Sequence, residues 1–431
     1  MQLQNTSQPQ SHDWKPRFFI IWTGQAFSLI GSSLTQFVLI WWITQTTGSP
    51  KALAITSIAG LLPVAIFSPL GGAVADRFSR RLVMMVTDAI TAGCVLIIIS
   101  LFASGQIEVW HIYVLVFIRA TMQAFQHPAI TSSTVNLVPG SWLNRVAGMN
   151  QVMQGIMTIA AAPLGALILA FLPVQQAMLI DVFTAILGIT PLFFFRIPQP
   201  ERNDTGEQPS ILADVRQGGV YIRQNRGFLV LLMVNALAVL TLFPSLSLSP
   251  LLVTKHFHGE ITDVALIEGI SGVGVILGGV LAGVWSLSHR KIISSIIFFS
   301  LSSATVALTA VPSRDFFVIA IVTWFISGLT YSMGNAPMIA VMQSVIPNEL
   351  QGRVFSLFNM TVGLAGPIGL AIAGPIAESI GVRPVFIWSG ALSMVATLCA
   401  LFSRDLRNIE DHRQNPKASP ASATTLDSVQ T

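Results

Sequence analysis

The sequence predicts an all-α integral membrane protein with twelve transmembrane helices in two six-helix halves. Composition is the first indication: 52% of the 431 residues are hydrophobic and only 10% carry a charge, whereas a soluble domain carries about 25% charged residues. The second is a series of apolar runs of about 20 residues, a length that crosses a bilayer as a helix. The third is a likeness between the two halves of the chain.

The apolar runs give the order of the predicted helices. Pro367 and Pro375 interrupt the eleventh run, but proline is tolerated in a spanning helix when neighbours satisfy the freed carbonyl groups. We therefore count that run as one span. The predicted spans are residues 18–44, 52–75, 82–104, 108–127, 147–170, 176–195, 228–253, 262–287, 291–312, 315–338, 354–378 and 383–403.

Basic residues predict the orientation of these spans. If both termini are cytoplasmic, most of the 23 Lys and Arg residues lie on the inner side, as the positive-inside rule requires. The first 17 residues are polar and the apolar stretch after them is too long for a signal peptide, so we expect the first span to be retained. We expect a multi-pass protein of the plasma membrane, whose outer side carries only Lys51, Lys255, Arg314 and Arg383 among its basic residues.

The two halves are related by local sequence. Pro128 and Pro139 precede an Arg-Val pair, and Pro347 precedes another in the second half, after Pro337 near the end of a span. Parallel repeats of this kind place a transport site near mid-membrane at the interface of the repeats. The predicted divisions are a cytoplasmic segment 1–17, bundles 18–195 and 228–403, a linker 196–227 with an amphipathic helix from Ser210, and a disordered cytoplasmic tail 404–431.

A charged segment joins the second and third spans, and we name it the gating loop. It places four charges within six residues, and ionised groups at mid-membrane are costly, so the loop must lie at a water boundary. The glycines before it allow close helix packing. Asp88, seven residues past Arg81, is expected to pair with a loop arginine and stabilise one conformation. The candidates are Gly72, Asp76, Arg77, Arg80, Arg81 and Asp88.

Other charges fall inside predicted spans, where they are functional candidates by default. Arg119 lies near the middle of the fourth span and needs an acceptor or water, because its guanidinium stays protonated. Asp181 and Glu268 lie near the outer ends of the sixth and eighth spans, where protonation could change with the solvent they face. The alternatives are a structural arginine that locks two helices and carboxylates that are simply hydrated.

Neutral polar residues predict a mainly apolar cavity with dispersed hydrogen-bonding groups. Gln25, Ser28, Ser32 and Gln36 share one face of the first span, and a polar face on a spanning helix should look inward. Individually such residues are more often contacts between helices. Together they favour a bulky amphiphilic ligand. The cavity candidates are Trp22, Gln25, Ser32, Gln36, Gln123, Gln151, Gln154, Asn235 and Asn359.

Several classes of protein are not supported. The chain contains no P-loop and no converging catalytic cluster, and its seven His and two Cys residues lack metal-ligand spacing. We therefore expect no enzyme activity, no cofactor, no metal and no nucleic-acid partner, and a single chain is expected to suffice for function. Small residues with proline predict close, bendable helix contacts at Gly155, Pro163, Gly165, Gly366 and Pro367.

The gating loop resembles the loop between the second and third helices of the major facilitator superfamily, in the order Gly-x-x-x-Asp-Arg-x-x-Arg-Arg. Ser79 stands where that pattern usually has Gly. Arg119 and Gln123 resemble the family's fourth-helix pattern, with Ala124 in place of a Gly. The segments 21–26, 117–119 and 352–357 are similar to the macrolide-efflux branch. The likeness covers about residues 15–403.

This resemblance implies secondary active efflux of an organic compound in exchange for protons, with Arg119 associated with proton coupling. Pro163 with its small neighbours partly resembles the Gly-Pro pattern of drug antiporters. Close branches export siderophores and other amphiphiles, so the substrate stays open. A proton-coupled nutrient importer of the same fold, a membrane enzyme and a sensor without transport activity are the remaining alternatives.

Overall fold

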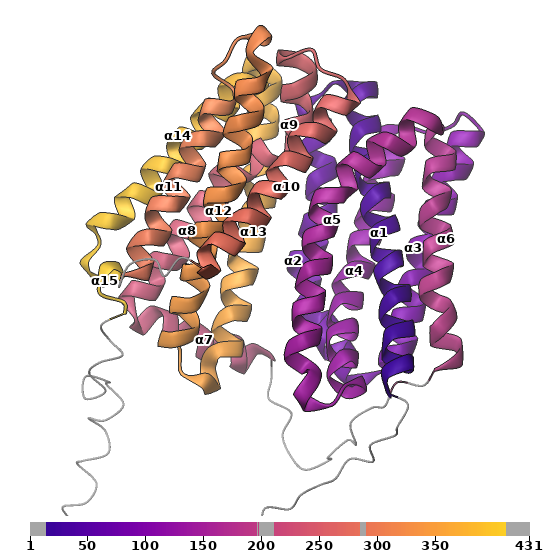
Figure 1. Ribbon diagram of the computed structural model, residues 1–431, viewed down its shortest axis with the longest axis horizontal. Helices are drawn as coiled ribbons and strands as arrows, with labels where there is room; N and C mark the ends of the chain where they lie inside the picture. The colour runs from indigo at the N-terminus through magenta and orange to yellow at the C-terminus, as the bar shows by residue number, and fades with distance from the viewer. Residues whose placement is uncertain (1–13, 196, 198–210, 285–289, 411–431) are drawn as a thin grey trace, which may run out of the picture. The chain divides into compact units, whose positions relative to one another are not determined.

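The computed structural model describes residues 14–195, 197, 211–284 and 290–410, and every regular element in these ranges is helical (Figure 1). Serine caps and proline at helix starts set several boundaries; Ser49, for example, caps α2 ahead of Pro50. The long helices are α1 (Trp14–Thr47), α2 (Pro50–Arg77), α3 (Arg80–Ala103), α4 (Val109–Leu137), α5 (Leu143–Phe171), α6 (Val174–Phe194), α8 (Arg226–Ser247), α10 (Ile261–Val284), α11 (Lys291–Thr309), α12 (Phe317–Val345), α13 (Asn348–Ile380) and α14 (Val382–Cys399).

Each predicted span corresponds to one of these long helices, and α13 runs without a break through Pro367 and Pro375. In the described ranges, ten helices are long and apolar enough to cross a membrane, and an eleventh is α5 if its two bent segments form one span. The remaining long helix, α4, carries Arg119, Gln123 and Gln126, which lower its hydropathy. It packs against α2 and α3, so part of its polar surface is shielded from lipid.

The chain divides into two compact units. Unit 1 comprises residues 1–205 and 253–269, and unit 2 comprises residues 206–252 and 270–431. Sequence reasoning divides the chain once, at 196–227, whereas the first part of α10 groups with unit 1. The predicted division stays a prediction.

Four helix contacts of unit 1 recur in unit 2. In unit 1, α1 packs against α5 and α6, and α3 packs against α4 and α6. In unit 2, α8 packs against α13 and α14, and α11 packs against α12 and α14. Each pair thus has a counterpart in the other unit, which agrees with the sequence likeness of the two halves.

The short helices at the ends of unit 2 are held by apolar side chains. α7 (Ile211–Gln224) lies where an amphipathic helix was expected, with Ile222 buried and Arg223 exposed. The prediction of disorder from residue 404 is wrong for residues 404–410. Here Ser403 caps α15 (Arg404–Arg407), and Leu406 and Ile409 are buried in the core of unit 2. The rest of the predicted tail, 411–431, lies outside the described residues, as do 1–13 and most of the linker.

A bend interrupts α5. Its segments Gly140–Met157 and Ile159–Phe171 meet at 41°. Pro163 follows the bend by about one turn, which is where the missing amide and the ring of a proline disturb a helix. Pro163 therefore accounts for the bend that the sequence suggested.

Candidate functional site

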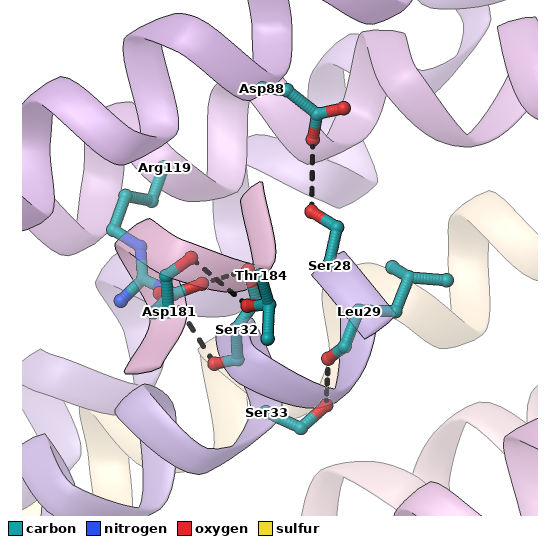
Figure 2. Close-up of polar contacts among 8 residues, drawn as sticks. All are labelled: Ser28, Leu29, Ser32, Ser33, Asp88, Arg119, Asp181 and Thr184. Carbon is teal, nitrogen blue, oxygen red and sulfur yellow. Dashed lines mark hydrogen bonds and ion pairs between the residues drawn. The ribbon is translucent and has the colours of Figure 1, made fainter. Parts of the chain in front are cut away.

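The polar face of α1 contacts two buried carboxyl groups inside unit 1. Gln25 and Ser28 bond to Asp88 on α3, and Ser32, one turn farther along α1, bonds to Asp181 on α6. Figure 2 shows Ser28 directed toward Asp88 and Ser32 toward Asp181. The residues that give a spanning helix a polar stripe thus serve as donors to carboxylates of neighbouring helices.

Arg119 and Asp181 form a buried ion pair. Nη2 of Arg119 lies 3.0 Å from Oδ2 of Asp181, and the side chains are only 8% and 2% exposed. Ser32 donates to the other carboxylate oxygen at 3.0 Å, and Thr184 donates to the backbone oxygen of Asp181. The pair therefore joins α4 to α6.

The guanidinium of Arg119 is only partly satisfied. Nη2 reaches Asp181 and, at 3.5 Å, the carbonyl oxygen of Ser32. Nε and Nη1 are buried and have no hydrogen-bond partner in the described part of the chain. A buried donor without a partner costs free energy. Arg119 therefore has hydrogen-bonding capacity left for water or for a ligand acceptor.

Asp88 is bound by neutral donors. Gln126 donates to its Oδ1 at 2.6 Å, Ser28 to the same oxygen at 3.2 Å, and Gln25 to Oδ2 at 3.0 Å. The side chain is 2% exposed.

The expected pairing of Asp88 with a gating-loop arginine is therefore wrong. Arg81 lies seven residues before Asp88 on the same helix, which is about 10 Å along the axis, and donates instead to the carbonyl oxygen of Phe193 at 3.1 Å. Arg80 donates to the carbonyl oxygen of Ser132 at 2.8 Å. The arginines thus tie the start of α3 to the ends of α4 and α6.

The glycines just before the gating-loop charges differ in how closely α4 approaches them. A Cβ on Gly71 would overlap the carbonyl oxygen of Ala124 on α4, whereas nothing lies within 4 Å of one on Gly72. Gly71 is thus the glycine that the close contact of α2 with α4 requires. Arg77 is exposed, and the side chain of Asp76 lies outside the described residues.

Glycines bring α1 and α6 together beside the ion pair. A Cβ on Gly24 would lie 2.7 Å from the carbonyl oxygen of Leu187, and one on Gly188 would lie 2.9 Å from Cβ of Ser28. A Cβ on Gly31 would overlap the hydroxyl of Thr184 and lie 3.0 Å from Cα of Asp181. The distance between the two backbones, and hence the reach of Ser32 to Asp181, depends on these glycines.

A small cavity in unit 1 adjoins this polar face. It has about 30 Å³ open to the centres of water molecules, enough for about two waters. On its wall, the indole nitrogen of Trp22 donates to Oδ1 of Asn150 at 2.7 Å. The lining residues are Phe18, Ile21, Trp22, Gln25, Leu29, Met84, Ile130, Ser133, Thr134, Leu137, Asn150 and Met153.

Of the cavity candidates, the structure brings Trp22 and Gln25 to this cavity and Ser32 to the ion pair. Gln36 is half-buried on α1, and Glu268 is half-buried on α10. In unit 2, Nδ2 of Asn235 approaches the sulfur of Met338 at 3.2 Å. The structure does not place the other candidates in the polar cluster around the two carboxyls, and their side chains are exposed: Gln123, Gln151, Gln154 and Asn359.

The helix-packing candidates differ in how closely a neighbouring side chain approaches them. A Cβ on Gly165 would lie 2.5 Å from the ring of Phe37, and one on Gly366 would lie 3.3 Å from the ring of Phe243. Pro367 is buried next to Gly366, and Gly155 is half-buried on α5. Gly165 is therefore the tightest of these contacts, against α1.

Sequence reasoning missed Gln126 and Thr184. Gln126 follows Arg119 by seven residues and so lies on the same face of α4, and Thr184 follows Asp181 by three on α6. That spacing was the available signal, although it does not identify a partner on another helix. Among the described residues, no group of three or more His, Cys, Asp and Glu is placed to hold a metal ion.

Comparison with known proteins identifies a family whose sequence model matches this chain. The sequence model of the Major Facilitator Superfamily matches residues 21–369 and, in a second match, 243–428. Macrolide efflux protein A of Streptococcus pyogenes is 32% identical over 93% of this chain and 98% of its own length. Multidrug efflux pump Tap of Mycolicibacterium fortuitum is 24% identical over 88% of this chain and 94% of its own length.

Solved structures share the fold at low sequence identity. The nucleoside transporter NupG aligns with a TM-score of 0.68 at 15% identity, over 90% of this chain and 98% of that one. A bacterial homologue of the iron transporter ferroportin, in an inward-facing state, aligns with a TM-score of 0.68 at 14% identity, over 90% and 98% of the two chains.

Proposed function

Because the chain belongs to the Major Facilitator Superfamily of transporters, we propose that it exports an amphiphilic organic compound of the macrolide kind in exchange for protons. The observation that carries this proposal is the similarity to macrolide efflux protein A along nearly the full length of both chains. The sequence supports it as well, because few charges fall within the predicted spans, whereas a sugar phosphate or inorganic anion would need more cations.

The ion pair is the proposed coupling element. Protonation of Asp181 removes its attraction for Arg119, which frees a guanidinium that already has two unpartnered nitrogens. The helices α4 and α6 then lose one of their links and can adopt a second arrangement. Proton entry supplies the energy, about 2.3 kcal/mol per charge per 100 mV of membrane potential, provided that proton and substrate movements are linked.

The protein is proposed to act as a monomer in the bacterial inner membrane with both termini in the cytoplasm. The distribution of basic residues supports this orientation. In this orientation the gating loop lies on the cytoplasmic side.

Growth of a pump-deficient bacterial host tests the function. Expression should raise the concentration of macrolides needed to stop growth, and a protonophore should remove the difference. The Arg119→Ala variant is the matched control. Unchanged susceptibility to every compound in a broad drug panel, with the protein detected in the membrane, would contradict efflux.

Two carboxyl substitutions test the carriers of the proton. We expect Asp181→Asn to lower proton-driven transport strongly, because the neutral amide cannot release a proton, and Glu268→Gln to lower it as well. The measurement is macrolide uptake into inverted membrane vesicles driven by a pH gradient. If both variants transport like the unsubstituted protein, neither carboxyl carries the coupled proton.

Trp22→Phe tests the cavity wall. The change keeps an aromatic ring but removes the donor to Asn150, and a hydrogen bond contributes about 0.5–1.5 kcal/mol. We expect the macrolide concentration for half-maximal transport to rise about two- to tenfold, with a smaller change in maximal rate. Trp388→Phe, at an exposed position on α14, is the control and should leave both values unchanged. Equal effects of the two variants would argue against a ligand at this cavity.

A further inference from the structure

Asp88 is a buried carboxyl that bonds to no cation among the residues that the structure describes. It is 2% exposed, and its contacts are with Gln25, Ser28 and Gln126, all of them neutral. Burying an ionised carboxylate is unfavourable unless a charge partner or several donors replace its hydration. Three donors offset part of this cost for the ionised form, and the protonated form avoids it. Asp88 can therefore exist in either state in the same position.

Asp181, the other buried carboxyl of unit 1, has the opposite surroundings. It is equally buried, but Arg119 places a positive charge 3.0 Å from its oxygen. Protonating Asp181 would leave that guanidinium buried and uncompensated. Protonating Asp88 leaves no bound cation without its opposite charge. The two carboxyls thus differ in their partners and not in their depth.

Charged groups on the surrounding helices do not change this contrast. α4 contributes Arg119, which is bound to Asp181 of α6, and His127, which is exposed. α1 carries its charges in its first turn, whereas α2 carries one in its first turn and two in its last. On α3 itself, Arg80 and Arg81 donate to backbone carbonyls at the start of the helix. The charged residues of α1 and α2 are Lys15, Arg17, Lys51, Asp76 and Arg77.

A path to water passes through Gln25. This residue lines the cavity, and its amide donates both to Asp88 and to the carbonyl oxygen of Gly188. The cavity has room for about two waters. A proton on one of these waters is then separated from the carboxyl of Asp88 only by the side chain of Gln25. The same face of α1 continues through Ser28 to Ser32, which bonds to Asp181. One face of α1 thus contacts both Asp88 and the ion pair.

We propose that Asp88 is a second proton-binding group of the transporter and takes its proton from water in the cavity of unit 1. The loss of its negative charge then affects the Arg119–Asp181 pair through the polar face of α1. Protonation adds an O–H donor to one carboxylate oxygen, and Gln126 or Gln25 accepts from it when its amide turns to present its oxygen. The role in export depends on the proposed function, whereas proton binding does not.

Infrared difference spectroscopy of the purified full chain tests proton binding directly. Spectra are compared across the pH range in which transport is active. We expect a carboxylic C=O stretching band that disappears as the pH rises, that Asp88→Asn lacks, and that Asp88→Glu keeps at a shifted frequency. Asp181→Asn and the exposed Asp315→Asn should retain the band. If Asp88→Asn retains it too, Asp88 does not bind a proton and the proposal fails.

Gln126→Met provides a second variant that keeps the carboxyl. It removes the shortest hydrogen bond to the ionised form, so the same band should persist to more alkaline pH. If the band disappears at the same pH in Gln126→Met as in the unsubstituted protein, the assignment to Asp88 is wrong. This result decides the matter even if Asp88→Asn does not fold.

Transport measurements test the coupling. In proteoliposomes, Asp88→Asn should keep exchange of a radiolabelled macrolide between the two sides and move fewer protons per macrolide, whereas Asp88→Glu keeps the ratio. An unchanged ratio in Asp88→Asn would overturn the coupling role. Should no macrolide be transported by the unsubstituted protein, the proposed function fails while the infrared result still decides whether Asp88 binds a proton.

Discussion

Replacing Arg119 with alanine is expected to abolish proton-driven export and to destabilise the protein. The change leaves the carboxylate of Asp181, 2% exposed, without its cation. Removing one partner of a buried ion pair costs about 3–5 kcal/mol. It also removes the group that proton uptake at Asp181 is proposed to release. Thermal unfolding in detergent and pH-driven uptake into vesicles measure the two effects separately.

The double variant Arg119→Ala with Asp181→Asn separates structure from transport. With both charges gone, no buried ion is left unpaired, so much of the lost stability should return, and the double-mutant cycle isolates the interaction between the two side chains. Proton-driven export should stay absent. Recovery of transport together with stability would mean that the pair only holds α4 and α6 together.

Leucine at position 31 is expected to disrupt the contact between α1 and α6. Even a Cβ there overlaps the hydroxyl of Thr184 and lies 3.0 Å from Cα of Asp181. Overpacking of this kind costs about 1–3 kcal/mol for smaller insertions, and a leucine must separate the helices further. Ser32 would then lose its reach to Asp181. We expect a lower unfolding temperature and loss of export.

Alanine variants provide the controls for Gly31. Gly148→Ala, at a helical position with nothing within 4 Å of the added carbon, should keep transport and gain a little stability, because alanine favours helix over glycine by about 0.5–1 kcal/mol. Gly31→Ala should be destabilising, and Thr184→Ala in the same chain should recover part of the loss. A Gly31→Leu protein as stable as the original would contradict the close packing of α1 and α6.

The helices were predictable because each apolar run is long and its length is set by the bilayer. α4 is instructive: its polar residues exclude it from a test on hydropathy alone, but the apolar run at 108–127 still predicted a helix. The ordered segment 404–410 was not predictable from composition. Leu406 and Ile409 are buried only because unit 2 offers them an apolar surface, and that surface is built by residues distant in the sequence.

Which residues belong to the candidate site could be predicted from the sequence better than which of them contact one another. Arg119 and Asp181 were identified because charges inside a span are costly and therefore few. The partner of Asp88 was mispredicted because the arginines nearest in sequence lie two turns away along the same helix, while Gln126 lies on another. Contacts between helices depend on how they pack, and glycines such as Gly31 that set this packing resemble any other small residue in the sequence.

Proton flux measured during macrolide transport tests the central claim most directly. Purified protein is placed in liposomes that contain a pH-sensitive dye, and a macrolide gradient is applied without a pH gradient. Movement of the macrolide in one direction should drive protons in the other, and Arg119→Ala should abolish this flux. Macrolide transport with no proton movement, or with protons moving in the same direction, would contradict the account.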